Sequence, residues 1–294
     1  MTIISHGRII WSPSFIAFDP LSSHSIVGGQ RMQSPRRHGR GLTTGNPHAT
    51  ARNVFDDSGS SDDLMAKPHE SLDKIRLFHS LDPKDIAELE YRCSWRHAQA
   101  KEWLFEQDDM GTDVYFLTSG AVRVLMTPAP DRPVILTDIN AGGYFGELAA
   151  IDGQPRSAAI LAITNATLAC MPALVFREIL HKHPDVNDQV LRLLVARVRA
   201  LTQRVNEFSS MHVKHRIYAE LLRRARPDPS DQRRGMVSPP PVHSDIAARV
   251  STRREMVARE LKALERAGLL TKRRGALVIT SVSSLAQRLQ SASE

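Results

Sequence analysis

Six apolar residues follow one another at alternating spacings of 3 and 4 between positions 191 and 208. This heptad spacing predicts a long helix, opening near Asp185, with one apolar seam along its length. Charged side chains fill positions in between, so we predict that a second copy covers the seam in a symmetric homodimer. Packing of the seam on the chain's own domain is the alternative. The seam consists of Leu191, Leu194, Val198, Leu201, Val205 and Phe208.

The chain of 294 residues divides around this helix. Such a length has room for two modest domains and extra segments, because domains typically run about 100–150 residues. Residues 1–64 are rich in Ser, Gly, Pro, Arg and His without a sustained period, which predicts a disordered tail. Residues 65–184 hold a short helix and several strand-like runs, which favour a compact antiparallel roll or barrel. Residues 185–211 hold the predicted dimerisation helix.

Residues 212–294 form the third part and carry the excess positive charge. They contain 17 Lys and Arg against 8 Asp and Glu, whereas residues 1–211 contain 22 against 24. This imbalance predicts that the C-terminal part binds a polyanion.

The order of elements in this third part is also informative. A helix and a polar linker come first, followed by a short helix from about Ser244 to Arg249, a turn, a second helix and two strands joined at residues 273–275. Helix, turn, helix and hairpin in this order predict a winged helix-turn-helix. The predicted buried face of the second helix consists of Met256, Val257, Leu261 and Leu264.

The run "GGYFGELAAIDGQPRSAAI" (residues 142–160) places one acid, Glu147, nine residues ahead of one base, Arg156, among glycines, small residues and aliphatics. Its core, "FGELAAIDGQPRSA", is similar to the phosphate-binding cassette of cyclic-nucleotide-binding domains. Together with the two downstream elements, it makes residues 74–290 resemble a Crp/Fnr-type transcription regulator. The resemblance implies an α+β fold, in which an antiparallel β-roll of the double-stranded jelly-roll type is joined by a long dimerisation helix to a C-terminal winged helix-turn-helix.

A cyclic phosphate is a monoanion joined to a ribose with a free 2′-hydroxyl, so its pocket needs one cation and one acceptor. The resemblance assigns the phosphate to Arg156, whose rigid fork matches phosphate oxygens, and the hydroxyl to Glu147. Gly146 lets the backbone approach closely, and Ser157 adds a hydroxyl donor. On the dimerisation helix, Thr202 alone is expected to reach the base, across the dimer. The expected nucleotide-binding residues are Gly146, Glu147, Leu148, Arg156, Ser157, Ala158 and Thr202.

The second helix of the C-terminal part, "TRREMVARELKALE", is similar to the recognition helix of the same family. The resemblance places Arg254, Glu255 and Arg259 against base edges, where Arg can fork onto guanine and Glu can accept from a cytosine amino group. Ser251 stands where a glycine often makes the turn in related proteins. The expected phosphate contacts are Thr252, Arg253, Lys272, Arg273 and Arg274.

The resemblance implies a cyclic-nucleotide-responsive DNA-binding transcription regulator, with cAMP favoured as effector and cGMP as the second choice. Ligand in the roll repositions the two winged helices of a homodimer on double-stranded DNA with a pseudo-palindromic site, and RNA polymerase is a further expected partner. Two alternatives stay open. One is a DNA-binding regulator that senses a cyclic dinucleotide, a haem-bound gas or no ligand. The other is a module that binds cyclic nucleotide without reading DNA.

Other classes of protein are disfavoured. Cys93 and Cys170 are too few for a disulfide framework or a cluster held by cysteines, so a reducing cytoplasm is expected. His181 and His183 lack further ligands, so no metal is expected. The sequence contains no run of about 18 apolar residues, so we expect no membrane partner. The P-loop, G-x-S-x-G and H-E-x-x-H motifs are absent, so we predict that the protein is not an enzyme.

Overall fold

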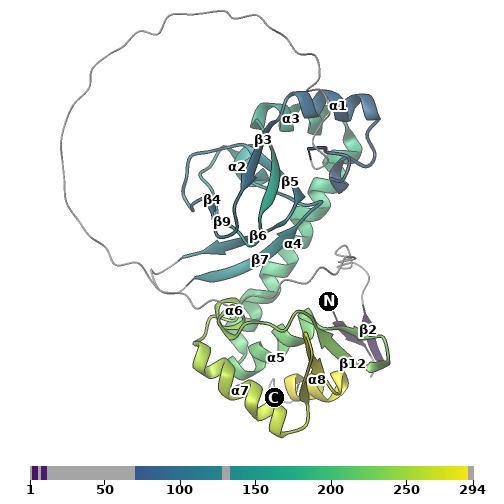
Figure 1. Ribbon diagram of the computed structural model, residues 1–294, viewed down its shortest axis with the longest axis vertical. Helices are drawn as coiled ribbons and strands as arrows, with labels where there is room; N and C mark the ends of the chain where they lie inside the picture. Colours follow the sequence, from purple (N-terminus) through teal and green to yellow (C-terminus); the bar gives the residue numbers. More distant parts are fainter. Residues whose placement is uncertain (1, 6–7, 12–69, 128–132, 291–294) are drawn as a thin grey trace, which may run out of the picture. The chain divides into compact units, whose positions relative to one another are not determined.

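The computed structural model describes residues 2–5, 8–11, 70–127 and 133–290 (Figure 1). Residues 70–183 contain two four-stranded antiparallel sheets that form a roll. The first sheet has the order β3-β10-β5-β8, made of β3 (Ser94–Ala98), β10 (Ala166–Met171), β5 (Val114–Ser119) and β8 (Tyr144–Phe145). The second sheet has the order β4-β9-β6-β7, made of β4 (Trp103–Phe105), β9 (Ala159–Ala162), β6 (Ala121–Met126) and β7 (Val134–Asn140).

The apolar core of the roll lies on both faces of the first sheet. Alternate residues of a strand point to opposite faces, and β5 shows this directly. Tyr115 and Leu117 belong to the cluster between the two sheets, whereas Val114 and Phe116 belong to a second cluster. That second cluster includes buried residues of the 3-10 turn η2 (Arg76–Phe78), α1 (Pro83–Tyr91) and α3 (Ala173–Lys182). Helical elements therefore cover the face of the first sheet that is turned away from the second.

Two short strands lie in the segment that the sequence predicts as a tail. β1 (Thr2–Ser5) pairs antiparallel with β2 (Arg8–Trp11), with Thr2 opposite Trp11. Residues 12–69 lie outside the described residues. The tail over residues 1–64 stays a prediction.

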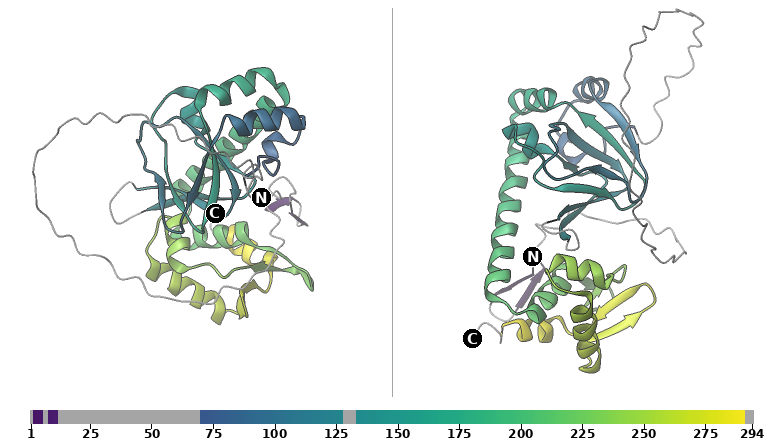
Figure 2. Two further views of the ribbon diagram at one scale, coloured as in Figure 1. Left: turned by 45° about the horizontal axis from the view of Figure 1, so that its top comes forward. Right: turned by 90° about the vertical axis from the view of Figure 1, so that its left-hand side faces the viewer.

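α4 (Pro184–Ser210) is one continuous helix, as the heptad spacing predicts, and its N-terminal half packs on the roll (Figure 2). Val186 and Val190 are buried in the second cluster, and Leu193 packs against it. These three residues follow one another at spacings of 4 and 3, which places them on one helix face. α4 therefore carries a roll-facing stripe in addition to the predicted dimer seam.

A group of four charged side chains joins α4 to α5 (Val213–Arg224). Arg223 of α5 pairs with Glu207 of α4 and with Glu220 of its own helix. Arg204 of α4 lies 3.5 Å from Glu220 and 3.8 Å from Glu207. Both glutamates are buried, and a buried charge that loses its partner is costly. This junction cluster therefore holds the end of α4 and α5 in one arrangement.

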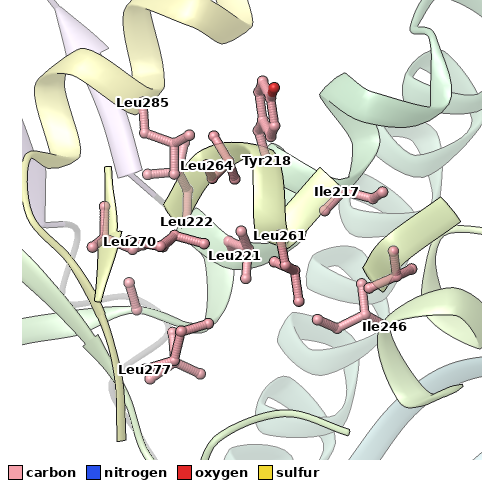
Figure 3. Close-up of a cluster of buried hydrophobic side chains, with 14 of the residues drawn as sticks. Ile217, Tyr218, Leu221, Leu222, Ile246, Leu261, Leu264, Leu270, Leu277 and Leu285 are labelled. Atoms are coloured by element: carbon pink, nitrogen blue, oxygen red, sulfur yellow. The ribbon is translucent and has the colours of Figure 1, made fainter. Parts of the chain in front are cut away.

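The C-terminal part is built around one apolar cluster, shown in Figure 3. Leu221 of α5, Ile246 of α6 (His243–Arg249), Leu261 of α7 (Arg254–Arg266) and Leu285 of α8 (Val282–Gln290) all belong to it. A sheet of order β11-β12-β14-β13 completes this part, and β13 (Leu270–Arg273) with β14 (Ala276–Ile279) is the predicted hairpin. The α+β fold, with a roll, a long helix and a winged helix-turn-helix, is confirmed.

Two predictions for the C-terminal part are wrong. The polar linker after α5 forms β11 (Arg226–Asp228) and β12 (Asp231–Val237), because residues 235–237 pair with β14, which lies some forty residues further along the chain. Met256 is 38% exposed rather than buried. The buried stripe of α7 starts at Val257, and adjacent helical residues lie about 100° apart around the axis.

Candidate nucleotide pocket and DNA-reading surface

The cassette turns at Gly146, just before α2 (Glu147–Asp152). Its φ is +87°, in the left-handed region, and a Cβ at this position would lie 2.7 Å from both Arg156 Nη1 and the main-chain oxygen of Asp113. Only glycine combines this backbone conformation with such a close approach. Gly146 therefore allows the arginine of the cassette to lie against the main chain of the turn.

The Arg156 side chain is 3% exposed. Its Nη2 donates to the main-chain oxygen of Asp113 at 2.8 Å, and its Nη1 donates to that of Gly146 at 3.1 Å. The main chain of Arg156 bonds both Asp108 and Asp109 at 2.8 Å, which fixes the base of the side chain. Desolvation lowers the pKa of Arg156. The guanidinium is thus a buried cation that bonds neutral carbonyl groups, and it can gain from a bound anion.

The Glu147 carboxylate is 1% exposed and pairs with Arg197 of α4 rather than with Arg156. Arg197 Nη1 donates to its Oε1, whereas Oε2 is buried without a partner in the described part of the chain. Tyr144 of β8 also has a buried hydroxyl without a partner among those residues. Burial first, and then the charge of Glu147, raise the pKa of Tyr144.

Three buried polar atoms of the cassette region therefore lack a hydrogen bond among the described residues. They are Tyr144 Oη, Glu147 Oε2 and Arg156 Nε. Most buried polar groups in proteins are hydrogen-bonded, so the unpartnered atoms of the acid and the base are candidates for contacts with a polar ligand. Oε2 can only accept when ionised and Nε–H can only donate. The site suits a small molecule with a hydroxyl donor at one place and an anionic acceptor at another.

Arg197 is a site residue that the sequence analysis missed, although a signal for it exists. Val186, Val190 and Leu193 define the roll-facing stripe of α4, and Arg197 is the next position of that stripe, four residues after Leu193. A charged residue that continues an apolar stripe faces the same surface. The roll-facing stripe of α4 therefore begins in the core of the roll and ends at Arg197, which contacts Glu147 of the cassette.

The other predicted nucleotide-binding residues differ in their exposure. Ala158 is buried, whereas Leu148 and Ser157 are exposed. Thr202 Oγ1 donates to the main-chain oxygen of Val198 at 3.0 Å. The Thr202 hydroxyl is thus engaged with its own helix, and its contact with a base stays a prediction.

The predicted seam of α4 is largely exposed in the single chain. Five of its residues are between 37% and 64% exposed, and Val195 beside them is 53% exposed. Leu194 instead packs partly against the second cluster of the roll. A contiguous apolar stripe of this size marks an interaction surface. The five exposed seam residues are Leu191, Val198, Leu201, Val205 and Phe208.

The three predicted base-reading residues lie on the outer surface of α7. Arg254, Glu255 and Arg259 are exposed, and no hydrogen bond or ion pair engages them within the described ranges. Glu260 of the same helix, by contrast, accepts from the Tyr218 hydroxyl of α5. The outward charges of α7 can thus contact a partner.

The turn before α7 carries two of the predicted phosphate contacts. Ser251 has a φ of +51°, so the position does need the left-handed backbone that glycine prefers. Thr252 N donates to the main-chain oxygen of Ala247 at 2.9 Å, which closes the turn. Arg253 follows at the N-cap of α7 and is exposed.

The other three predicted phosphate contacts lie on the hairpin of β13 and β14. Lys272 pairs with Glu265 at 2.9 Å, and Arg273 lies 3.4 Å from Asp228. Arg274 is exposed at the turn. All three cations are exposed. The Lys272–Glu265 pair lies at the surface, where ion pairs contribute little energy, whereas the Asp228 carboxylate is buried. Lys272 can therefore exchange its pair for a phosphate contact, and Arg274 is exposed for one.

Neither a metal-binding group nor a membrane-spanning helix is found among the described residues. No group of three or more His, Cys, Asp or Glu side chains there is arranged to hold a metal ion. None of the helices in that part of the chain combines the length and the apolar character that a bilayer crossing requires.

Comparisons with known proteins identify two domains in this chain. Residues 95–183 match the cyclic nucleotide-binding domain, and residues 215–288 match the Crp-like helix-turn-helix domain. The cAMP-activated global transcriptional regulator CRP of Salmonella typhimurium is 28% identical over 189 residues, covering 64% of this chain and 90% of that protein. The cyclic AMP receptor protein of Thermus thermophilus is 28% identical over 197 residues, covering 66% and 87%.

Solved structures show the same fold. A mutant of CooA from Carboxydothermus hydrogenoformans superposes with a TM-score of 0.60 at 18% identity, covering 68% of this chain and 88% of that one. The c-di-GMP responsive regulator CLP of Xanthomonas campestris gives a TM-score of 0.56 at 21% identity, covering 67% and 99%. The fold and the two matched domains define a DNA-binding regulator with a cyclic-nucleotide-binding domain. The chain belongs to the Crp/Fnr family of transcription regulators, as the cassette and the recognition helix predict.

Proposed function

We propose that this protein is a homodimeric transcription regulator that responds to a cyclic nucleotide and has no catalytic activity. The observation that carries the proposal is the pair of opposite charges in the cassette. Glu147 and Arg156 are buried, do not pair with each other, and each keep one buried atom without a partner among the described residues. A ribose 2′-hydroxyl can donate to Glu147 Oε2, and a cyclic phosphate can accept from Arg156 Nε–H.

cAMP is the favoured effector, with cGMP second. The relatives from Salmonella typhimurium and Thermus thermophilus carry cAMP in their names, and both align over most of their length. The cassette of this chain supplies the groups that the sugar and the phosphate require, whichever purine is attached.

Arg197 connects the proposed ligand to the long helix. A ligand hydroxyl that donates to Glu147 shares the carboxylate with Arg197, so its binding changes the strength of the contact between α4 and the roll. A ligand can shift two arrangements of α4 only if it binds one of them more tightly. The junction cluster then passes a movement of α4 to α5 and the C-terminal part.

The exposed seam of α4 supports the homodimer, because the seams of two copies can cover each other symmetrically. In such a dimer the two α7 helices can enter successive major grooves about one helical turn apart, which requires a pseudo-palindromic site. RNA polymerase stays a predicted partner.

The proposal is tested by calorimetry of the full chain with cAMP and with cGMP, with and without a DNA site selected from random sequence. We expect binding of one nucleotide and tighter DNA binding in its presence. Arg156→Ala should lose nucleotide binding while its DNA-binding part stays folded. Unchanged nucleotide affinity in that variant would refute the pocket.

A cyclic dinucleotide is the second candidate effector. CLP, which is named as c-di-GMP responsive, shares the fold, and Leu148 and Ser157 leave the outer side of the cassette exposed. A thermal-shift comparison of cAMP, cGMP and c-di-GMP separates the candidates, because only the true effector should raise the melting temperature at low concentration.

A further inference from the structure

Three aromatic rings stand together beside the cassette. Phe105 of β4, Tyr115 of β5 and Phe145 of β8 have ring centroids 5.3 to 5.9 Å apart. Arg156 Cζ lies over the Phe105 ring, 4.4 Å from its centroid, and 5.6 Å from the centroid of Tyr115. Cation–π attraction acts within about 6 Å of a ring centroid. Phe105 and Tyr115 therefore form an aromatic shelf for the guanidinium, with Phe105 as its nearer member.

The main chain ties the shelf to the arginine at two places. In the pairing of β4 with β9, Phe105 lies opposite Ile160, which follows Arg156 by four residues. Asp108 and Asp109, just after Phe105, bond the main chain of Arg156. The ring and the cation are thus carried by two segments that are bonded to each other, so their relative position is fixed by the backbone.

The Phe105 ring has no hydrogen-bonding group, so it takes none of the donors of Arg156. A guanidinium has five N–H donors in one plane, and two of those in Arg156 are used by the main-chain oxygens of Gly146 and Asp113. The buried Nε–H has no partner within the described residues. A ring that lies over the flat face of the guanidinium takes none of the in-plane donors. Phe105 thus lies against the cation, while the buried Nε–H keeps no hydrogen-bond partner among the described residues.

We propose that Phe105 is a positioning residue for anion binding, because its ring fixes the plane in which Arg156 presents its remaining donors. This inference rests on the proposed function, since it requires a ligand phosphate at Arg156. Recognition of phosphate by the two-pronged edge of an arginine depends on the orientation of that edge. An arginine that can turn about its last bonds binds the same anion less tightly.

Simple apolar packing is the competing explanation, because Phe105 also contacts Phe145, at 5.9 Å between ring centroids. The two roles differ in one property. Packing depends on the volume of the ring, whereas attraction to a cation depends on the negative charge of the ring face. Fluorine atoms on the ring withdraw that charge and leave the volume nearly unchanged.

The experiment is calorimetry of the full chain with cAMP and cGMP for wild type, Phe105→Leu and Phe105→Tyr, and for chains with mono-, di- and trifluorinated phenylalanine at position 105. We expect Phe105→Leu to lose about tenfold in affinity, Phe105→Tyr to stay near wild type, and the fluorinated series to weaken stepwise. The matched control is the same fluorinated series at Phe78, which packs against Phe116 in the other cluster. It should leave the affinity unchanged.

A second readout does not need a ligand. The Nε–H proton resonance of Arg156 should show a ring-current shift in the wild type that disappears in Phe105→Leu, while melting curves confirm that both proteins fold. Nucleotide binding that is equal in wild type, Phe105→Leu and the fluorinated series would overturn the role of Phe105 and leave the proposed function intact. Absence of binding by the wild type to either nucleotide would instead overturn the proposed function and, with it, the role of Phe105 in binding.

Discussion

Arg197 on α4 pairs with the buried carboxylate of Glu147, which lies 50 residues earlier in the chain and begins α2. This ion pair joins the cassette directly to the helix that carries the dimer seam. The Glu147 carboxylate is 1% exposed, and its partner Arg197 is carried by α4. The strength of this ion pair is therefore sensitive to small movements of α4.

Arg197→Gln is therefore expected to weaken the coupling between ligand and DNA. Removal of the partner of a buried carboxylate should lower the free energy of unfolding by about 1–3 kcal/mol, which urea unfolding measures. The nucleotide-dependent gain in DNA affinity, measured by fluorescence anisotropy, should fall more than the nucleotide affinity itself. A variant that keeps the full gain would contradict this role, and Arg192→Gln, on an exposed pair of the same helix, is the control.

Gly146→Ala is expected to disrupt the cassette. The left-handed backbone costs a side-chain-bearing residue about 1–2 kcal/mol, and the new Cβ would also collide with Arg156 and with the Asp113 carbonyl. Gly153→Ala is a matched control, because its φ is +71° and its Cβ would meet nothing within 4 Å. Both variants should lose stability in thermal unfolding, but only Gly146→Ala should also lose nucleotide binding. Equal binding by the two would argue against the tight turn at Gly146.

Ser251→Gly should stabilise the C-terminal part. Ser251 has a φ of +51°, and glycine adopts this backbone without steric cost although it loses more entropy on folding. The net gain is expected to be about 0.5–1 kcal/mol in denaturant unfolding. DNA affinity should stay the same, since the side chain makes no hydrogen bond in the described residues. A loss of stability would show that the serine side chain has a role that its backbone conformation does not reveal.

His215 should make the protein less stable in mild acid. It is buried on α5 with an Nδ1 that lacks a partner among the described residues, and desolvation, followed by the charges of Lys214 and His212, lowers its pKa. The unfolded chain therefore binds a proton at a higher pH than the folded one, so stability falls as the pH drops below about 6.5. His215→Gln should show a smaller fall between about pH 7.5 and 5.5 in urea unfolding. The exposed His181 provides the control substitution, and an equal slope in wild type and His215→Gln would refute the assignment.

Glu255→Ala should relax the choice of DNA sequence more than it weakens binding to random DNA. Arg274→Ala, at the turn of the hairpin, should instead weaken binding to all sequences. The slope of log K against log salt should then fall by about 0.9 for each phosphate that the variant no longer neutralises. Gel shifts with selected and random duplexes over a range of salt distinguish the two effects. Equal losses on both kinds of DNA in Glu255→Ala would exclude base reading at that position.

Local patterns in the sequence predicted the parts of this protein whose structure depends on neighbouring residues. The seam predicted α4 almost to its ends, and the glycine, acid and arginine of the cassette predicted a turn with two buried charges. β12 was missed because its partner β14 lies far along the chain. Met256 was wrongly predicted as buried because adjacent residues of a helix lie about 100° apart around its axis, so the residue next to a buried one can be exposed. Arg197 and Phe105 were missed for a related reason. Each acts on the cassette from another element, and only the folded chain shows which residue of α4 or β4 lies there.

α4 has its roll-facing stripe and its dimer seam on different faces of a single rigid rod. Any twist of that rod about its long axis that carries Arg197 away from Glu147 must turn the predicted seam by the same angle. In the proposed homodimer, we therefore expect ligand binding in each roll to reach the partner chain as a rotation of α4, without any lengthening or bending of that helix.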